Sequence, residues 1–144
     1  MKKFEAGFIG AGNMGGALAT AAAKQVTGER VAVACSSPAH SAAAAERLGC
    51  RAAAPEEILG GSKFVFLGVK PQMLQALLAE LKAPLSARTD RPVLVSMAAS
   101  VTIRTIRETL GLPCPVVRIM PNLPVALGKG AVLISPDDTV TEDE

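Results

Sequence analysis

The chain has 144 residues, of which 49% are hydrophobic and 19% are charged, and its formal net charge at pH 7 is +2. This length and composition fit one folded domain with a full core and exclude a disordered chain. The low net charge, the absence of Trp and Tyr and the presence of only four Phe exclude a basic, aromatic surface for nucleic acid.

The chain opens with an apolar strand, a glycine-rich turn and a helix. A predicted strand over residues 4–9 runs into Gly10, Gly12 and Gly15, which match the spacing G-x-G-x-x-G, and a segment of high helix propensity, residues 17–24, follows. Gly10 permits a tight turn, Gly12 lets a diphosphate approach the backbone, and Gly15 lets the helix pack close to the strand. The N–H groups at the start of this helix favour an anion, so the pattern predicts a dinucleotide site.

Strand-like and helix-like segments alternate along the rest of the chain. The expected strands are residues 30–35, 51–54, 64–69, 92–96, 115–119 and 130–134, and the expected helices are residues 38–48, 55–59, 71–82 and 102–110. The helix over 71–82 carries an apolar stripe made of Met73, Leu74, Leu77, Leu78 and Leu81. This alternation predicts an α/β fold with a doubly wound, mostly parallel sheet of Rossmann type, in which ligands bind beyond the carboxyl ends of the strands.

An acidic residue is missing where a site for NAD usually has one. Such a residue lies about twenty positions after the glycines and bonds the ribose 2′-hydroxyl. Here the second strand ends in Cys35, Ser36 and Ser37, and no acid stands between Val31 and Ala45. The absence favours NADP and leaves NAD open. Both serines suit the 2′-phosphate, and both equally suit the cap of the next helix.

The remaining reactive side chains assemble no catalytic set in the sequence. Cys35, Cys50 and Cys114 are scattered, which indicates reduced thiols in a cytoplasmic protein, and the single histidine, His40, has no partner of metal-ligand type. The apolar run after the N-terminal lysines is too short and interrupted for a secretory signal, and no run is long enough to span a membrane. We therefore assign no catalytic residue, no metal site and no membrane partner.

Four segments in order along the chain resemble the N-terminal half of pyrroline-5-carboxylate reductase. These segments are residues 8–15 (FIGAGNMG), 67–72 (LGVKPQ), 96–101 (SMAASV) and 118–124 (RIMPNLP). Together they are far more specific than the glycines alone. Two positions depart from the usual pattern of the family, because Ser100 stands where Gly is usual and Leu123 stands where Thr is usual.

The resemblance implies an oxidoreductase that reduces Δ1-pyrroline-5-carboxylate to L-proline with NADPH or NADH, the last step of proline biosynthesis. It implies a Rossmann domain followed by a helical domain that builds a homo-oligomer and much of the substrate pocket. It also implies that residues 9–14 wrap the diphosphate and that the other segments border the ribose and the nicotinamide. The cofactor-binding residues expected on this basis are Ile9, Gly10, Ala11, Gly12, Asn13, Met14, Ser36, Ser37, Val69, Lys70, Pro71, Met97, Ala98 and Ala99.

The end of the chain suggests that only the cofactor half of such an enzyme is present. We expect residues 1–135 to form the NADP-binding domain and residues 136–144 to begin a linker or helix toward the helical domain, because Asp137 and Asp138 resemble a helix start. Alone, this half would bind NADPH weakly and reduce little or no substrate.

Two alternatives stay open. One is another NADP-dependent reductase with the same domain, linked to a deazaflavin or acting on a β-hydroxyacid, and the other is a nucleotide-binding module without catalysis.

Overall fold

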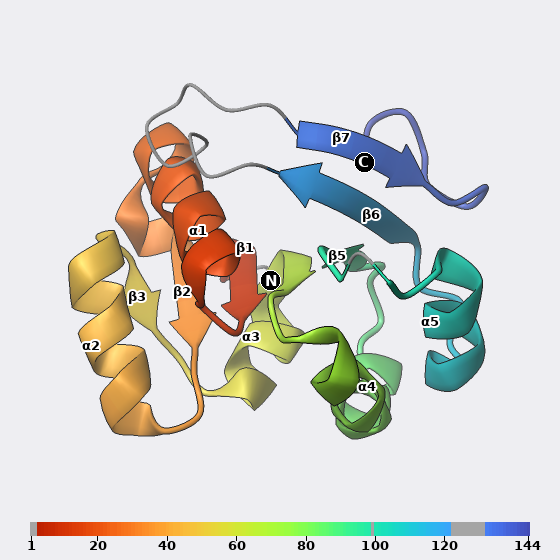
Figure 1. Ribbon diagram of the computed structural model, residues 1–144, viewed down its shortest axis with the longest axis horizontal. Helices are drawn as coiled ribbons and strands as arrows, with labels where there is room; N and C mark the ends of the chain where they lie inside the picture. Colours follow the sequence, from red (N-terminus) through yellow and green to blue (C-terminus); the bar gives the residue numbers. More distant parts are fainter. Residues whose placement is uncertain (1–2, 99, 122–131) are drawn as a thin grey trace.

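One twisted sheet with helices on both faces makes up the computed structural model, which describes residues 3–98, 100–121 and 132–144 (Figure 1). The strands are β1 (Phe4–Ile9), β2 (Val31–Ala34), β3 (Arg51–Ala52), β4 (Ser62–Leu67), β5 (Val93–Ser96), β6 (Val116–Pro121) and β7 (Val132–Pro136). The helices are α1 (Asn13–Val26), α2 (Pro38–Leu48), α3 (Pro55–Gly61), α4 (Pro71–Ser86) and α5 (Ile103–Leu110), and a 3₁₀ turn, η1 (Gly28–Arg30), precedes β2.

The strand order of the sheet is β3-β2-β1-β4-β5-β6-β7 among the described residues. All neighbouring strands from β3 to β6 pair in parallel, and β7 pairs with β6 in antiparallel fashion. The predicted α/β fold with a doubly wound, mostly parallel sheet is thus confirmed. The order reverses between β1 and β4, and open sheets of this kind bind ligands at the carboxyl ends of strands at such a point.

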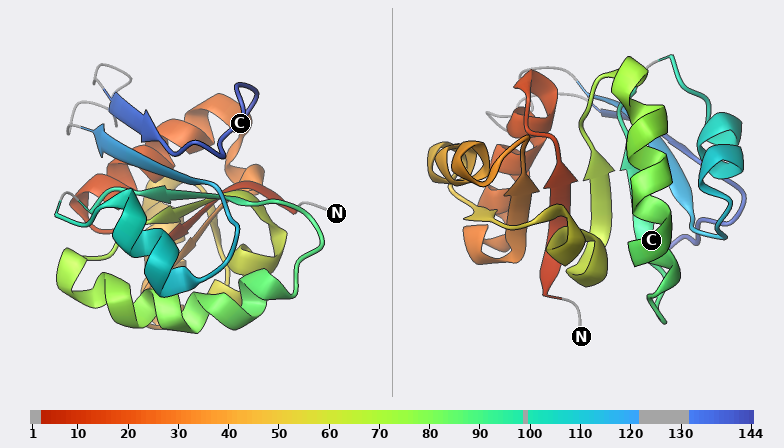
Figure 2. Two further views of the ribbon diagram at one scale, coloured as in Figure 1. Left: turned by 90° about the vertical axis from the view of Figure 1, so that its right-hand side faces the viewer. Right: turned by 90° about the horizontal axis from the view of Figure 1, so that it is seen from below.

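Helices lie on both faces of the sheet (Figure 2), and the side chains of β4 alternate between the cores on these faces. Val65 and Leu67 of β4 join the core made with α3, α4 and α5, whereas Phe66 joins residues of α1 and α2 on the other face. The rings of Phe8 and Phe66 stack there with centroids 4.4 Å apart. Because both faces of the central strands are covered, these strands read as continuous apolar runs in the sequence.

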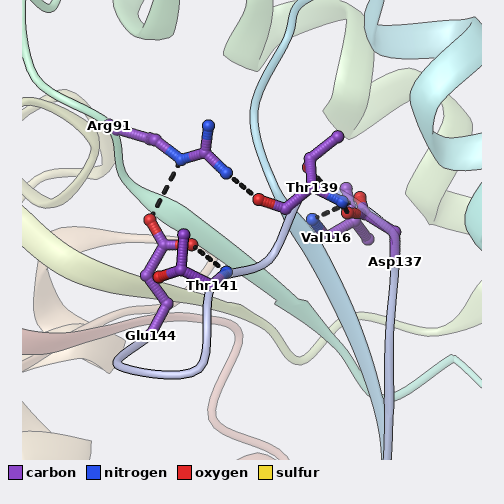
Figure 3. Close-up of polar contacts among 6 residues, drawn as sticks. All are labelled: Arg91, Val116, Asp137, Thr139, Thr141 and Glu144. Atoms are coloured by element: carbon purple, nitrogen blue, oxygen red, sulfur yellow. Dashed lines mark hydrogen bonds and ion pairs between the residues drawn. The ribbon is translucent and has the colours of Figure 1, made fainter.

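The C-terminal segment contacts the face over β5 and β6. Val140 packs against the cluster of Val93, Val95, Val117 and Ile119. The Arg91 side chain donates hydrogen bonds to the Glu144 carboxylate, at 3.0 Å, and to the Thr139 carbonyl (Figure 3). Pro136 belongs to β7 and residues 137–144 form turns, where the sequence indicated the start of a helix. The proposed division at residue 135 stays a prediction.

Helices α2 and α5 begin and end at recognisable caps. The Ser37 hydroxyl accepts a hydrogen bond from the N–H of His40 at the start of α2, and Gly49 ends that helix with a φ of 72°. Thr102 caps α5 in the same way, and Gly111 ends it with a φ of 65°.

One helix differs from its prediction in length and in its buried face. Helix α4 continues to Ser86, and its buried residues are Leu74, Leu78, Leu81 and Leu85. Met73 was expected in this stripe, but its side chain is 59% exposed. The buried positions recur every three or four residues, so the position directly before Leu74 lies at the edge of that face. Within the described part of the chain, no helix is both long enough and apolar enough to cross a bilayer.

Candidate functional site

The glycine turn lies where the ends of β1, β2 and β4 meet. The Gly10 N–H donates a hydrogen bond to the Ala34 carbonyl, and the Gly68 N–H donates one to the Ile9 carbonyl, both at 2.8 Å. Gly10 has a φ of 91°, and a Cβ there would lie 2.8 Å from the Gly68 carbonyl oxygen. A Cβ on Gly15 would lie 2.7 Å from the Gly10 carbonyl oxygen. These two glycines are therefore required by close backbone packing.

Gly12 differs from the other two glycines of the motif because no contact with a described residue requires a glycine there. Among the described residues, a Cβ built on Gly12 would meet no atom within 4 Å, and the φ and ψ of Gly12, −71° and −159°, are open to any residue. Gly12 is the N-cap of α1, and no side chain caps this helix or places an acid in its first turn. The first N–H groups of a helix lack partners within it. The turn thus leaves open space in front of main-chain donors, a cradle that fits a diphosphate.

A groove of about 710 Å³ borders the outer side of this turn. It is lined by Ala11, Gly12, Asn13, Gly16, Ala17, Thr20, Arg47 and Leu48. Arg47 comes from the last turn of α2, and its guanidinium lies 4.0 Å from a Cβ built on Gly16. The sequence offered no signal for this cation, because only the crossing of α1 and α2 brings it near the glycines.

The ends of β4 and β5 supply the segments expected on the nicotinamide side. Val69 is partly buried, and a Cβ on Gly10 would lie 3.2 Å from its Cγ1 atom. Lys70 is exposed and precedes α4 as its N-cap, and Pro71 is the first helical residue. Met97 is partly buried and packs against the cluster over β5 and β6. The Ala98 side chain is 3% exposed and belongs to the core, and the Ala98 N–H donates a hydrogen bond to the Ser96 hydroxyl at 3.3 Å.

Of four further residues in the resembling segments, three lie outside the part of the chain that the structure describes. Ala99 and Asn122 lie outside the described residues, as does Leu123, so their places are not assigned. Ser100 is described and is an exposed turn residue.

Three serines lie in the loop after β2 and the start of α2, and two of them bond the backbone of this segment. Ser37 caps α2, and the buried Ser41 hydroxyl accepts from the Cys35 N–H at 2.8 Å and donates to the Ser37 carbonyl at 2.9 Å. The third, Ser36, is exposed, and its hydroxyl lies 2.9 Å from Nδ1 of His40. Of the two serines expected at the adenosine, Ser36 is thus the one not used by the helix cap.

A cavity of about 430 Å³ adjoins Ser36 and includes residues that sequence reasoning missed. It is lined by Cys35, Ser36, Ser37, Pro38, Ser41, Ala52, Ala53, Ala54, Pro55 and Glu57. Glu57 brings an acid to this region from α3, beyond the segment in which an acid was sought. The Lys3 ammonium donates a hydrogen bond to the Glu57 carboxylate, which holds the pKa of this carboxyl below its usual range. The pairing of β3 with β2 brings the start of α3 beside Ser36, and no local pattern in the sequence indicates this proximity.

The described residues show no metal-binding cluster of three or more His, Cys, Asp or Glu side chains. Burial raises the pKa of the Cys50 thiol, with a further increase from Cys35, and burial also raises the pKa of Cys114. Both thiols are protonated at neutral pH, so neither provides a thiolate nucleophile. The described residues therefore fit a site that binds a dinucleotide.

Residues 5–100 match a protein family described as NADP oxidoreductase coenzyme F420-dependent. The chain belongs to this family. The match contains the glycine turn, the loop after β2 and the ends of β4 and β5.

Individual relatives extend the similarity to nearly the whole chain. Pyrroline-5-carboxylate reductase 3 of Danio rerio is 36% identical over 96% of this chain and 48% of its own length. The solved structure of a pyrroline-5-carboxylate reductase from Coxiella burnetii has a TM-score of 0.84 at 27% identity, over 99% of this chain and 53% of its own. That of the Plasmodium falciparum enzyme with NADP bound has a TM-score of 0.80 at 24% identity, over 99% of this chain and 52% of its own. The resemblance inferred from the four segments is confirmed, and the chain spans about half the length of these relatives.

Proposed function

We propose that this chain is the cofactor-binding half of an oxidoreductase that reduces Δ1-pyrroline-5-carboxylate to L-proline with NADPH or NADH. The observation that carries the proposal is the open backbone at Gly12, in front of the uncapped start of α1 and at the point where the strand order reverses. The similarity to pyrroline-5-carboxylate reductases over 96% of the chain supports this substrate. We infer a cytoplasmic, homo-oligomeric protein on the same grounds.

In this proposal, each segment at the carboxyl edge of the sheet contacts a different part of the dinucleotide. Residues 9–14 hold the diphosphate through main-chain N–H groups, and Ser36 lies at the adenosine ribose. Val69, Lys70 and Pro71 border the ribose on the nicotinamide side, where the Lys70 ammonium attracts phosphate or carboxylate groups. Met97, Ala98 and Ala99 run beside the nicotinamide. When bound, the nicotinamide supplies a hydride to the imine carbon of the pyrroline ring.

NADPH is the preferred form of the cofactor in this proposal. No acid follows β2 before Ala45, and the one acid that lines the neighbouring cavity, Glu57, is paired with Lys3. A 2′-phosphate therefore meets no unpaired carboxylate among the residues that line this cavity. The NADP bound to the Plasmodium falciparum relative points in the same direction.

The test is to titrate NADPH and NADH separately against the 144-residue chain and to detect binding by the intrinsic fluorescence of the nucleotide. Pyrroline reduction by the same chain is assayed in parallel. We expect binding of both nucleotides, tighter for NADPH, and little or no turnover, because the resemblance places much of the substrate pocket in a helical domain. Absence of binding by both nucleotides would contradict the proposal. Pyrroline reduction by the chain alone would contradict the assignment of the pocket to that domain.

A second candidate is an NADP-dependent reductase of a deazaflavin, which the description of the matched family favours. The residues 69–72 and 120–122 favour the pyrroline substrate instead, because they belong to the segments that resemble its reductases. A protein that contains this chain together with the helical domain, assayed with both substrates, distinguishes the two.

A further inference from the structure

His40 is a histidine that none of the predicted roles uses. It lies in the first turn of α2, is exposed, and its Nδ1 atom is 2.9 Å from the Ser36 hydroxyl. Its own N–H donates to the Ser37 hydroxyl at 3.2 Å, so the cap of α2 fixes the backbone of His40 directly after the end of β2. The imidazole is thereby positioned next to the serine that the helix does not use.

The charges around this pair suit an additional phosphate. In sites for NAD, the residue at the end of the second strand is an acid that bonds the ribose 2′-hydroxyl. Here Ser36 occupies that region, and the cavity beside it contains Glu57, whose carboxylate is held by the Lys3 ammonium. The loop thus lacks the repulsion that an acid would exert on a 2′-phosphate.

The hydrogen bond between Ser36 and His40 also defines which donors remain for a ligand. In a neutral imidazole that accepts at Nδ1 from the Ser36 hydroxyl, the proton is carried by Nε2. In the imidazolium, Nδ1–H donates to the serine oxygen, and the serine hydroxyl proton becomes available to a ligand. The charged pair then offers two donors and one positive charge, which is the complement of a phosphate monoester.

We propose that His40, held by Ser36, binds the 2′-phosphate of the dinucleotide and is the residue that sets the preference for NADPH over NADH. The inference rests on the proposed function, because it concerns the adenosine end of the same site. It adds a residue that lies in none of the four short segments from which the resemblance was inferred.

The experiment compares the dissociation constants of NADPH and NADH for the parent chain and for His40→Ala, with circular dichroism to check folding. We expect His40→Ala to weaken NADPH about tenfold, as for the loss of one charge-assisted hydrogen bond, and to leave NADH unchanged. His40→Lys should restore most of the NADPH affinity. The matched control is Arg104→Ala on α5, which removes an exposed cation elsewhere and should change neither constant.

A second variant tests the same site with the opposite charge. Ser36→Asp introduces the acid that sites for NAD contain, so NADPH should weaken more than tenfold and NADH should bind as well as before or more tightly. An unchanged NADPH constant in His40→Ala, or equal weakening of both nucleotides, would overturn the role of His40 while the proposed function stands. A parent chain that binds neither nucleotide would overturn both.

Discussion

At the scale of single residues, the three glycines of the motif have three different physical reasons. Gly10 adopts a φ of 91°, and Gly15 approaches the Gly10 carbonyl too closely for a side chain. Gly12 has ordinary dihedral angles and free space around it. Only Gly12 is therefore explained by an external ligand, and a substitution there separates binding from folding.

We expect Gly12→Asp to abolish NADPH binding without loss of stability. Asp is a favourable N-cap and its charge favours the start of α1, so the free energy of unfolding should stay the same or rise by about 0.5 kcal/mol, while the carboxylate occupies and repels the diphosphate position. Thermal unfolding and NADPH titration measure the two effects. Gly12→Ala, which adds bulk without charge, should weaken binding less. Equal affinity of Gly12→Asp and the parent for NADPH would refute the assigned site.

Gly15→Ala should instead destabilise the fold by about 1–3 kcal/mol, because the added Cβ would contact the Gly10 carbonyl.

At the scale of elements, the Asp137 carboxylate joins the residues that follow β7 to the start of β6, next to the antiparallel pairing of the two strands. One oxygen of Asp137 accepts from the Val116 N–H at 2.8 Å, and the other accepts from the N–H and the hydroxyl of Thr139 at 2.7 and 2.6 Å (Figure 3). The Nη1 atom of Arg107 in α5 lies 3.5 Å from the Oδ2 atom of Asp137, and the Asp137 side chain is 4% exposed. Burial raises the pKa of Asp137, but the hydrogen bonds from Thr139 and Val116 and the charge of Arg107 outweigh it, so the pKa lies below its usual range.

Asp137→Asn should lower the free energy of unfolding by about 2 kcal/mol near pH 7, because the buried N–H of Val116 and the Thr139 groups lose a charged acceptor. A carboxyl with a lowered folded-state pKa stabilises the fold above its unfolded value, about 3.9, and this contribution disappears as the pH falls through the folded value. The difference between parent and variant should therefore be constant above about pH 5 and shrink below about pH 4. Urea unfolding at a series of pH values measures this difference in the free energy of unfolding.

The matched control is Asp138→Asn at the exposed neighbouring position, which should have little effect on the free energy of unfolding. A difference that grows toward low pH would contradict this account.

At the scale of the whole molecule, the two faces of the sheet have unequal cover. Helices α3, α4 and α5 cover one face, while on the other α1 and α2 lie over the β3 side and the C-terminal turns contact the cluster over β5 and β6 (Figure 2). A cavity of about 790 Å³ opens there, lined mainly by apolar side chains such as Phe64, Val117 and Ile134. Ile134 is 68% exposed, and Leu133 on the same strand is 70% exposed. Exposed apolar surface of this kind next to an edge strand promotes association.

We expect the isolated chain to self-associate with rising concentration, and Ile134→Lys to reduce this association because it introduces a charge into the apolar cavity. Leu133→Lys is the matched control, since Leu133 is equally exposed on β7 but does not line the cavity. It should reduce association less. Sedimentation velocity over a concentration series measures both variants. Equal reduction by the two would show that the strand edge, rather than the apolar face, causes the association.

Short-range patterns of residues in the sequence were sufficient to predict most elements of the fold. The glycine turn, the apolar run of β4 and the caps at Ser37, Gly49 and Gly111 depend on residues next to one another, so they can be recognised without knowing the fold. The face of α4 was predicted less well. Met73 is apolar and lies next to Leu74, but it stands at the edge of the face formed by Leu74, Leu78, Leu81 and Leu85, and the packing of α4 on the sheet leaves it exposed.

By itself, the sequence determined the α/β class, the nucleotide loop and the resemblance to pyrroline-5-carboxylate reductase, because these depend on periodicity and on motifs of short span. Tertiary structure alone decided which residues join that loop. Pairing of β3 with β2 brings Glu57 to the cavity beside Ser36, and the crossing of α1 and α2 brings Arg47 to the groove beside Gly12. Likewise, the pairing of β6 with β7 buries Asp137 against Val116. Such contacts depend on strand order and register, which a single sequence does not encode in any local pattern.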